Sequence, residues 1–395
     1  MEDIKSYFEI VFLIFIILSS IFIGFKIMLL VVELKRGKQK RFINMYTTTK
    51  GTPLMRRDSA SFNQDNKTNI RPNVNTFKQK KETEEKYEII KYDNGDMYKG
   101  ELKEGKRSGF GICIFADKSR YEGLWKEDAM HSIGKYIYTD GSTYSGDFKF
   151  GVIEGVGMYT FQNKDIYKGE FKQGIRNGKG VISYSNGDKF LGNFKDNLKE
   201  GKGRYTSIDG DVYEGEYKAN KLHGKGSYTY SCGSKYVGEF KNNVYNGHGL
   251  YTSEDGDIYE GEFKYGYKKG YGILKYRNGE VYKGDFKDDL FEGKGIYLYK
   301  DKSIYEGEYV NGLRCGIGTY TCEVYRYIGE WSENNKQGVG TYYLEDGSRI
   351  EVIINGNRII SGTHIKTNGE EYEIHNVDIS EEEKSIIKDI FEFSK

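Results

Sequence analysis

Proline is nearly absent from this chain of 395 residues, which contains only Pro53 and Pro72. So little proline excludes a collagen-like chain despite the 51 glycines, and the 36 tyrosines exclude a flexible Gly/Ser linker. Hydrophobic residues make up 37% of the chain, and the aromatic share is 15%. Few aliphatic side chains remain for a thick core, so the composition indicates many short strands and tight turns.

Cysteine and histidine are also few. The four cysteines form no Cys-x-x-Cys pair, and the five histidines stand at no metal-ligand spacing with one another or with a cysteine. We therefore expect a reducing compartment, no disulfide scaffold and no metal site.

The sequence also lacks a P-loop, a Gly-x-Ser-x-Gly motif, a His-Glu-x-x-His motif and an EF-hand loop. We expect no catalytic residues and no cofactor, and hence a protein that is not an enzyme.

Neither sign of charge is in excess. The chain holds 60 basic and 59 acidic residues, and this balance excludes a globally basic nucleic-acid-binding protein. The balance conceals an asymmetry, because residues 26–81 hold 14 Lys and Arg against 3 Asp and Glu, a net charge of +11. Residues 82–395 hold 45 basic against 53 acidic residues, a net charge of −8. Residues 35–86, which include both prolines, are predicted to form a basic disordered linker.

A long apolar run lies near the N-terminus. Residues 10–32 form a stretch of 23 residues with one charge, at Lys26, and about 20 apolar residues suffice to span a bilayer. We predict a transmembrane helix at about 10–32, within an N-terminal segment 1–34. A cleaved signal peptide is the alternative, although the acidic start and the lack of an Ala-x-Ala site speak against it.

The residues that follow this run set the expected topology. Five basic residues come directly after it and few come before it, so the positive-inside rule places the C-terminal part in the cytoplasm of a single-pass protein. The same residues are candidate contacts for anionic lipids, although a topology signal alone would also explain them. These residues are Lys35, Arg36, Lys38, Lys40 and Arg41. Which membrane is involved stays open.

A 23-residue period runs through the rest of the chain. An aromatic residue, called place 1, recurs at residues 98, 121, 144, 167, 190, 213, 236, 259, 282 and 305, and again at 327. Places 3 and 14 are Gly in all eleven units, and place 12 is Gly in ten, with Ser132 as the exception. Place 5 is aromatic except at Leu102, place 4 is mostly acidic, and place 6 is mostly Lys.

This pattern predicts a hairpin for each unit. Because side chains alternate along a strand, places 1, 3 and 5 share one face, and places 2, 4 and 6 share the other. We expect an aromatic face, a charged face with charge ladders of places 4 and 6, and rings lying flat over the Cβ-less glycines. The fold class is all-β: an elongated single-layer antiparallel sheet of consecutive hairpins, with an N-terminal transmembrane helix and a short C-terminal helix.

The repeated unit, for example Tyr167-Lys-Gly-Glu-Phe-Lys-Gln-Gly-Ile-Arg-Asn-Gly-Lys-Gly, resembles the MORN repeat over residues 98–349. We expect a repeat array over 87–372, in which 350–371 form a degraded unit. Residues 373–395 are expected to hold a helix that begins with a capping box at Ser380. This helix is expected to cap the last sheet edge, with a partner or dimer contact as the alternative.

The resemblance implies a scaffold, since MORN proteins often act at membranes and cytoskeletal structures and many self-associate. The first hypothesis is a membrane-anchored scaffold that binds a helix or an extended peptide through its aromatic, glycine-lined face. The second is a phospholipid-binding membrane-junction tether similar to junctophilins, and a third is a regulatory relative of MORN-containing lipid kinases or methyltransferases. The candidate partner-binding residues are Tyr144, Phe148, Tyr167, Phe171, Tyr213, Tyr217, Tyr236, Phe240, Tyr259, Phe263, Tyr282, Phe286, Tyr305 and Tyr309.

Overall fold

A computed structural model of the chain describes residues 88–356, 358–379, 383, 385–387 and 389. The predicted transmembrane helix at 10–32, the linker at 35–86 and the basic residues from Lys35 to Arg41 lie outside the described residues. In the part that is described, no helix has the length and apolar character needed to cross a membrane.

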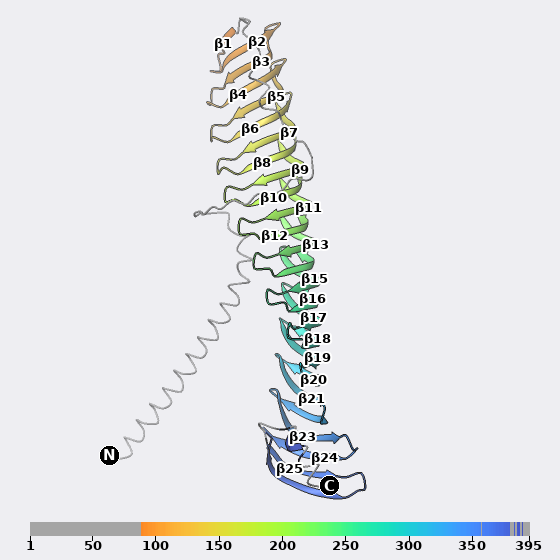
Figure 1. Cartoon of the computed structure of the whole chain (residues 1–395). Coiled ribbons are helices and arrows are strands. Elements are labelled where there is room, and N and C mark those ends of the chain that lie inside the picture. Colours follow the sequence, from red (N-terminus) through yellow and green to blue (C-terminus); the bar gives the residue numbers. More distant parts are fainter. Residues whose placement is uncertain (1–87, 357, 380–382, 384, 388, 390–395) are drawn as a thin grey trace, which may run out of the picture. The chain divides into compact units, whose positions relative to one another are not determined.

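The described chain forms one sheet of 26 strands (Figure 1). The strands are β1 (Glu88–Lys91), β2 (Met97–Lys103), β3 (Lys106–Ile114), β4 (Arg120–Lys126), β5 (Ala129–Ile137), β6 (Thr143–Lys149), β7 (Val152–Thr160), β8 (Ile166–Lys172), β9 (Ile175–Ser183), β10 (Lys189–Lys195), β11 (Leu198–Thr206), β12 (Val212–Lys218), β13 (Lys221–Thr229), β14 (Lys235–Lys241), β15 (Val244–Thr252), β16 (Ile258–Lys264), β17 (Tyr267–Lys275), β18 (Val281–Lys287), β19 (Leu290–Leu298), β20 (Ile304–Val310), β21 (Leu313–Thr321), β22 (Tyr325–Ser332), β23 (Asn335–Leu344), β24 (Arg349–Asn355), β25 (Arg358–Ile365) and β26 (Glu371–Asp378).

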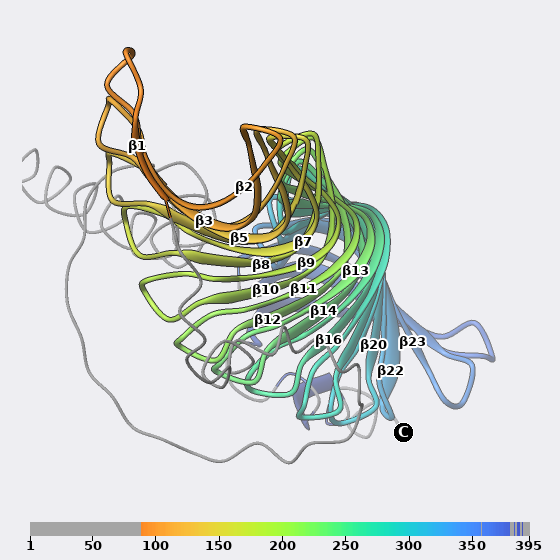
Figure 2. The same cartoon turned by 90° about the horizontal axis from the view of Figure 1, so that it is seen from above.

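Each strand pairs antiparallel with its neighbours in the chain, from β1 with β2 to β25 with β26. The predicted fold class, an all-β antiparallel sheet of consecutive hairpins, is therefore confirmed. Figure 2 shows that the strands are bent and that their direction turns steadily from β2 to β23, as the right-handed twist of strands requires.

The register places the repeat positions on the two faces as predicted. In the first unit, Tyr98 is opposite Cys113 and Gly100 is opposite Gly111, so places 1 and 16 and places 3 and 14 share a face. Leu102 is opposite Arg107, which adds places 5 and 10 to that face. The aromatic face is thus made of places 1, 3, 5, 10, 14, 16 and 18.

The first turn of each unit explains why place 8 is always Gly, Asn or Asp. Glu104 and Gly105, at places 7 and 8 of the first unit, both have a positive φ, of 52° and 75°. Two central residues with positive φ form the type I′ turn that suits the twist of a two-residue hairpin. Asn at place 8 also links units, because Asn197 Oδ1 accepts the Arg176 N–H of the preceding unit at 2.9 Å.

The second turn links neighbouring units in a similar way. Asp96, at the end of the turn before β2, accepts the Ala116 N–H with Oδ1 at 2.9 Å. Four unit spacings further on, Asp188 accepts the Ile208 N–H with Oδ1 at 2.9 Å. Asp165, Asp211 and Asp257 make the same bond to the next turn along the sheet, so the link is present where this place holds Asp.

A β-bulge follows place 3 and gives the acidic residues of place 4 a role that differs from the predicted charge ladder. The register shifts between Gly146 and Phe148, where Asp147 lies. Asp147 Oδ2 accepts the Val156 N–H at 2.8 Å, beside Gly155 at place 12, whose φ is +86°. Among the ion pairs of the described residues, none joins place 4 to place 6, and the place 4 carboxylate serves the backbone of the bulge instead.

The C-terminal end continues the sheet further than the sequence pattern indicated. β24 and β25 form the predicted degraded hairpin, in which Ile350, Val352 and Ile354 replace the aromatic residues and glycine. β26 extends to Asp378, beyond the expected end of the array at residue 372. Glu383, Ser385 to Ile387 and Asp389 are helical, which agrees with a short helix after Ser380.

Candidate binding surface

The tyrosine at place 1 lies flat across both glycines of its unit. A Cβ built on Gly146 or Gly157 would overlap the ring of Tyr144, and the Tyr144 hydroxyl donates to the Asp147 carbonyl at 3.0 Å. The corresponding hydroxyl of Tyr167 donates to the Glu170 carbonyl at 2.9 Å. The predicted packing of rings over glycine is therefore confirmed, and the ring also pairs the carbonyl left open at the bulge.

The rings at place 5 fill the spaces between those at place 1. Phe148 meets Tyr144 edge-to-face at a centroid distance of 5.1 Å, and Phe171 of the next unit meets Tyr144 at 5.2 Å. The same contacts recur along the sheet, for example between Tyr282 and Phe286 at 5.1 Å. Such edge-to-face contacts are the preferred arrangement of aromatic pairs.

This packing corrects the predicted partner-binding face. All fourteen candidate rings at places 1 and 5 are between 0% and 6% exposed, so they form the core of the array and present almost no surface to a partner. The reason is that places 10, 16 and 18 lie on the same face and cover them. A partner on the aromatic face would therefore contact this covering layer.

Part of this covering layer is an accessible row of rings. The aromatic stripe, defined as Phe115, Tyr136, Tyr138, Tyr159 and Phe161 at places 16 and 18, is half-buried throughout. Its rings contact one another in sequence, with centroid distances from 4.6 Å between Tyr136 and Tyr138 to 5.8 Å between Tyr138 and Tyr159. Burial raises the pKa of the Tyr138 phenol to about 12.

The sequence pattern did not reveal the cations at place 10, because five other units hold Met, Ile, Leu, Tyr or Phe there. Lys199 Nζ lies 4.5 Å from the ring centroid of Phe190 and 5.3 Å from that of Tyr184. Burial lowers the pKa of Lys199 to about 8, against the opposing effect of Asp188. The cations of place 10 are Arg107, Arg176, Lys199, Lys268, Arg314 and Lys336.

A pocket of about 390 Å³ opens beside one of these cations. It is lined by Lys268, by the tyrosines 251, 259 and 276, by Leu274 and Phe291, and by two carboxylates, Asp257 and Asp289. Burial lowers the pKa of Lys268, and both aspartates oppose this effect. The pocket thus combines aromatic walls with charged groups of both signs.

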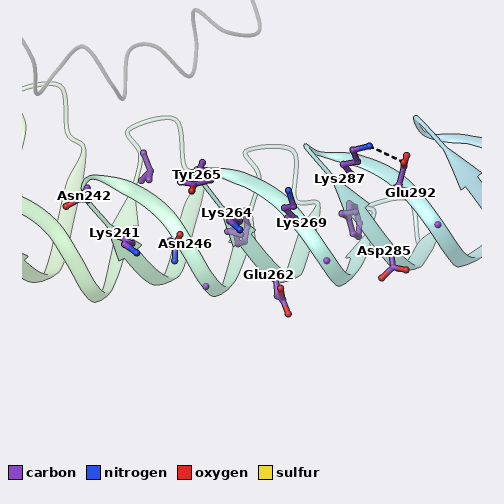
Figure 3. A pocket seen from close by; sticks show the side chains of 16 residues that line it. Lys241, Asn242, Asn246, Glu262, Lys264, Tyr265, Lys269, Asp285, Lys287 and Glu292 are labelled. Carbon is purple, nitrogen blue, oxygen red and sulfur yellow. Dashed lines mark hydrogen bonds and ion pairs between the residues drawn. The ribbon is translucent and has the colours of Figure 1, made fainter.

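A larger groove, of about 970 Å³, crosses three hairpins from β14 to β19 near their first turns (Figure 3). Four lysines line it together with Glu262, Asp285 and Glu292, and one ion pair joins Lys287 Nζ to Glu292 Oε1 at 3.5 Å. In Figure 3, Lys269 and Lys287 point to one side of the ribbon, and Glu262 and Asp285 point to the other. The lysines are Lys241, Lys264, Lys269 and Lys287.

The C-terminal helix contacts the aromatic face. The Glu383 carboxylate accepts hydrogen bonds from Lys336 Nζ and from the Tyr342 hydroxyl, at places 10 and 16 of the eleventh unit. One helical turn later, Ile387 is fully buried. Burial lowers the pKa of Lys336 to about 8, and Glu383 opposes this effect. These contacts lie on the face of β23 and not along β26, the last strand.

Metal ligands do not cluster on either face: among the described residues, no group of three or more His, Cys, Asp or Glu side chains could hold a metal ion. The thiols of Cys113, Cys232, Cys315 and Cys322 are free in the structure.

Comparison with known families gives one extended match. The MORN repeat model matches eleven segments, each of which starts at a place 1 residue: 98–120, 121–143, 144–166, 167–189, 190–212, 213–235, 236–258, 259–281, 282–304, 305–324 and 327–349. A comparison with curated proteins gave no match.

Solved structures show only distant similarity. The SAS-4 (dCPAP) TCP domain of Drosophila melanogaster, in complex with a proline-rich motif of Ana2 (dSTIL), is 14% identical, with 50% of this chain and 83% of that chain covered and a TM-score of 0.18. Virginiamycin B lyase from Staphylococcus aureus is 13% identical, with 74% and 94% covered and a TM-score of 0.12. Similarity at this level carries no argument about the present chain.

Proposed function

The chain belongs to the MORN repeat family, and on that basis we propose that it is a non-enzymatic scaffold that binds protein partners on its aromatic face. The observation that carries this proposal is the helix already seated there, with the Glu383 carboxylate on Lys336 and Ile387 fully buried. A face that holds a helix of its own chain has the chemistry to hold a helix of another. The contacting residues are those of places 10, 16 and 18.

We further propose that the scaffold is anchored in a membrane by residues 10–32 and that the array lies in the cytoplasm. The length of the apolar run and the basic residues after it support this arrangement. The test is extraction of membranes at alkaline pH, in which the full chain should stay in the pellet. Glycosylation at Asn66, the sequon of the basic linker, would contradict the topology.

Site-specific photo-cross-linking tests the proposed function. A photoreactive amino acid replaces Tyr138 on the aromatic face or, as a matched control, Lys135 on the other face of β5, the strand that ends one residue before Tyr138. We expect discrete protein adducts in native cells from position 138 and none from position 135. Equal adducts from both positions, or none from position 138 and none from the equivalent positions Tyr276 and Tyr299, would contradict partner binding on the aromatic face.

Lipid binding is a second candidate function, favoured by the four lysines around the larger groove and by the basic residues 35–41. The net charge of −8 over residues 82–395 opposes it for the array alone. Flotation with phosphoinositide liposomes separates the two sources, using residues 82–395 with and without the basic linker. Flotation of the array alone, lost when Lys264, Lys269 and Lys287 become Gln, would assign lipid binding to the groove.

A further inference from the structure

One part of the aromatic face is both accessible and uncharged. In the second and third units, the places of the aromatic face hold only Tyr, Trp, Phe, Gly, Met130 and Ile153. Met130 and Ile153, at place 10, are half-buried beside the aromatic stripe. Ser119 and Ser142 share hydrogen bonds with the hydroxyls of Tyr136 and Tyr159, at 2.7 and 3.0 Å, so these phenols already have polar partners. The surface therefore offers apolar contact area.

A cation marks the end of this region. Arg176, at place 10 of the fourth unit, has its guanidinium carbon 5.6 Å from the ring centroid of Phe161, the last ring of the stripe. Its side chain donates to the Asn197 carbonyl at 2.8 Å, and no described ion pair includes it. Arg107 at the opposite end differs, because it pairs with Asp128 at 3.3 Å. Arg176 is thus the cation beside the stripe that has no described carboxylate partner.

The other end of the sheet shows how such a cation is used. Lys336 also occupies place 10, lies 4.7 Å from the ring centroid of Tyr327, and receives a carboxylate from the C-terminal helix. On the helix, Glu383 and Ile387 are four residues apart, so one face delivers both a charge and an apolar side chain. Arg176 and the stripe repeat this combination of a ring-bound cation beside an apolar surface, with no described helix upon it.

We propose that the aromatic stripe and Arg176 form a docking site for an amphipathic helix of a partner protein, which lays an apolar side on the stripe and places a Glu or Asp on Arg176. This proposal rests on the proposed scaffold function and specifies its partner. Phe115 and Phe161 are two units apart, or four strand spacings, which is about 19 Å. At 1.5 Å per residue, about 13 helical residues cover that distance, so the partner segment has three to four apolar turns and an acidic end.

Binding of designed peptides to the full chain tests the proposal. The probe is a fluorescent 18-residue helix with a leucine stripe and two glutamates at one end, and its control has glutamines in their place. Fluorescence anisotropy is measured with wild type, with Arg176→Gln, and with Lys179→Gln, which removes an equal charge from an exposed position of the same strand. We expect about tenfold weaker binding for Arg176→Gln and for the glutamine peptide, and no change for Lys179→Gln.

A second variant tests the apolar part. Met130→Lys puts a charge into the uncharged region at a half-buried position. We expect it to weaken the binding of the acidic probe, because the leucine stripe would cover and desolvate the new charge. Circular dichroism of both variants shows whether the sheet is intact. Chemical shifts or hydrogen exchange of the loops around Phe161 should change on binding of the probe.

Three results would overturn the proposal: no binding of the acidic probe to wild type, equal affinity for wild type and Arg176→Gln, or a wild-type dimer that Arg176→Gln dissociates. The last result, obtained by light scattering, would identify a second copy as the occupant. The scaffold function itself is judged separately, because adducts from cross-linkers at Tyr276 or Tyr299 would still show partner binding elsewhere on the aromatic face.

Discussion

Single residues in this array have roles fixed by their place in the repeat. Places 3 and 14 require glycine in every unit, because a Cβ at either place would overlap the ring of place 1. The glycines at place 8 have a different role, since they supply a positive φ in open space that Asn or Asp supplies in other units. The two kinds of glycine should therefore respond differently to substitution.

Gly157→Ala tests the role of place 14. The added methyl would overlap the ring of Tyr144, so the ring must leave its position over the sheet, and we expect a loss of about 2–3 kcal/mol in the free energy of unfolding. Gly174→Asn is the control, because Asn197 occupies the equivalent place with a φ of 67° and a Cβ at Gly174 would meet nothing. Urea denaturation should show the control within 0.5 kcal/mol of wild type, as is typical of surface changes.

Lys199 gives a pH dependence with a definite sign. Its pKa is about 8 in the folded array against an ordinary value of 10.5, so between these values the unfolded chain binds the proton and the folded chain does not. The burial penalty therefore disappears as the pH rises, and wild-type stability increases in that window. Lys199→Met carries no such penalty and should have the higher free energy of unfolding at pH 7. Urea titrations of the variant and wild type should show this difference shrinking from pH 7 to pH 10.

The tyrosines lower the stability as the pH rises, and because both proteins contain them, their effect cancels in the comparison of Lys199→Met with wild type. Burial raises the pKa of Tyr167 and Tyr184 to about 12, so above pH 10 the unfolded chain loses protons that the folded chain keeps. Stability then falls with rising pH in both proteins. A constant difference between Lys199→Met and wild type from pH 7 to 10 would contradict the assigned role of burial at Lys199.

The residue patterns indicate which positions could be predicted from the sequence. Ring-over-glycine packing follows from invariant glycine next to invariant aromatic residues, and the structure confirms it. The burial of those rings could not be predicted, because it depends on strand bending and on places 10 and 16, whose residue types vary. The cations at place 10 gave no signal for the same reason: Lys199 and Leu222 occupy equivalent places in adjacent units.

At the scale of elements, the C-terminal helix and β23 form one docked pair. The helix is expected from its capping box and apolar spacing, but its target is not, because nothing in the sequence links Glu383 to Lys336 across 47 residues. The contact needs the sheet to bring β23 and the end of the chain together. Hairpins, by contrast, connect neighbouring residues, and for this reason their boundaries from the 23-residue period agree closely with the structure.

Paired substitutions at Lys336 and Glu383 test this docking. Lys336→Met leaves the half-buried Glu383 carboxylate without its cation, and Glu383→Gln leaves the buried Lys336 ammonium without its carboxylate. We expect each to weaken helix docking by about 3 kcal/mol. The double variant leaves no charge without its partner, so helix docking should recover much of the free energy that each single variant loses. Hydrogen exchange at residues 385–387 measures docking directly, while exchange in β5 to β10 serves as the internal control. Additive losses in the double variant would contradict a direct pair.

At the scale of the whole array, the units are interchangeable parts of one sheet. Each strand pairs only with its chain neighbours, so removing a complete 23-residue unit leaves both the strand direction and the face assignment intact. Removing half a unit breaks the antiparallel alternation. The array should therefore tolerate one kind of deletion and reject the other.

Deletion of residues 213–235 should yield a folded chain, and deletion of residues 213–224 should not. In the first variant two strand spacings are lost, so labels at Lys135 and Glu306 should move closer by about 10 Å. Energy transfer between the labels measures this change, and circular dichroism reports the fold. A folded protein after the shorter deletion, or an unchanged label distance after the longer one, would show that the units do not act as independent modules.

The hydrogen bonds by which Asp96 and Asn197 connect neighbouring units also affect how the chain folds. The hydrogen bonds that join units span only 20 or 21 residues, and strand pairings between consecutive hairpins, such as β3 with β4, span 6 to 16. Low sequence separation between contacts speeds folding, because little loop entropy is lost before a contact forms. A hairpin can thus complete its pairing as soon as the next one leaves the ribosome, so the array can grow unit by unit during synthesis.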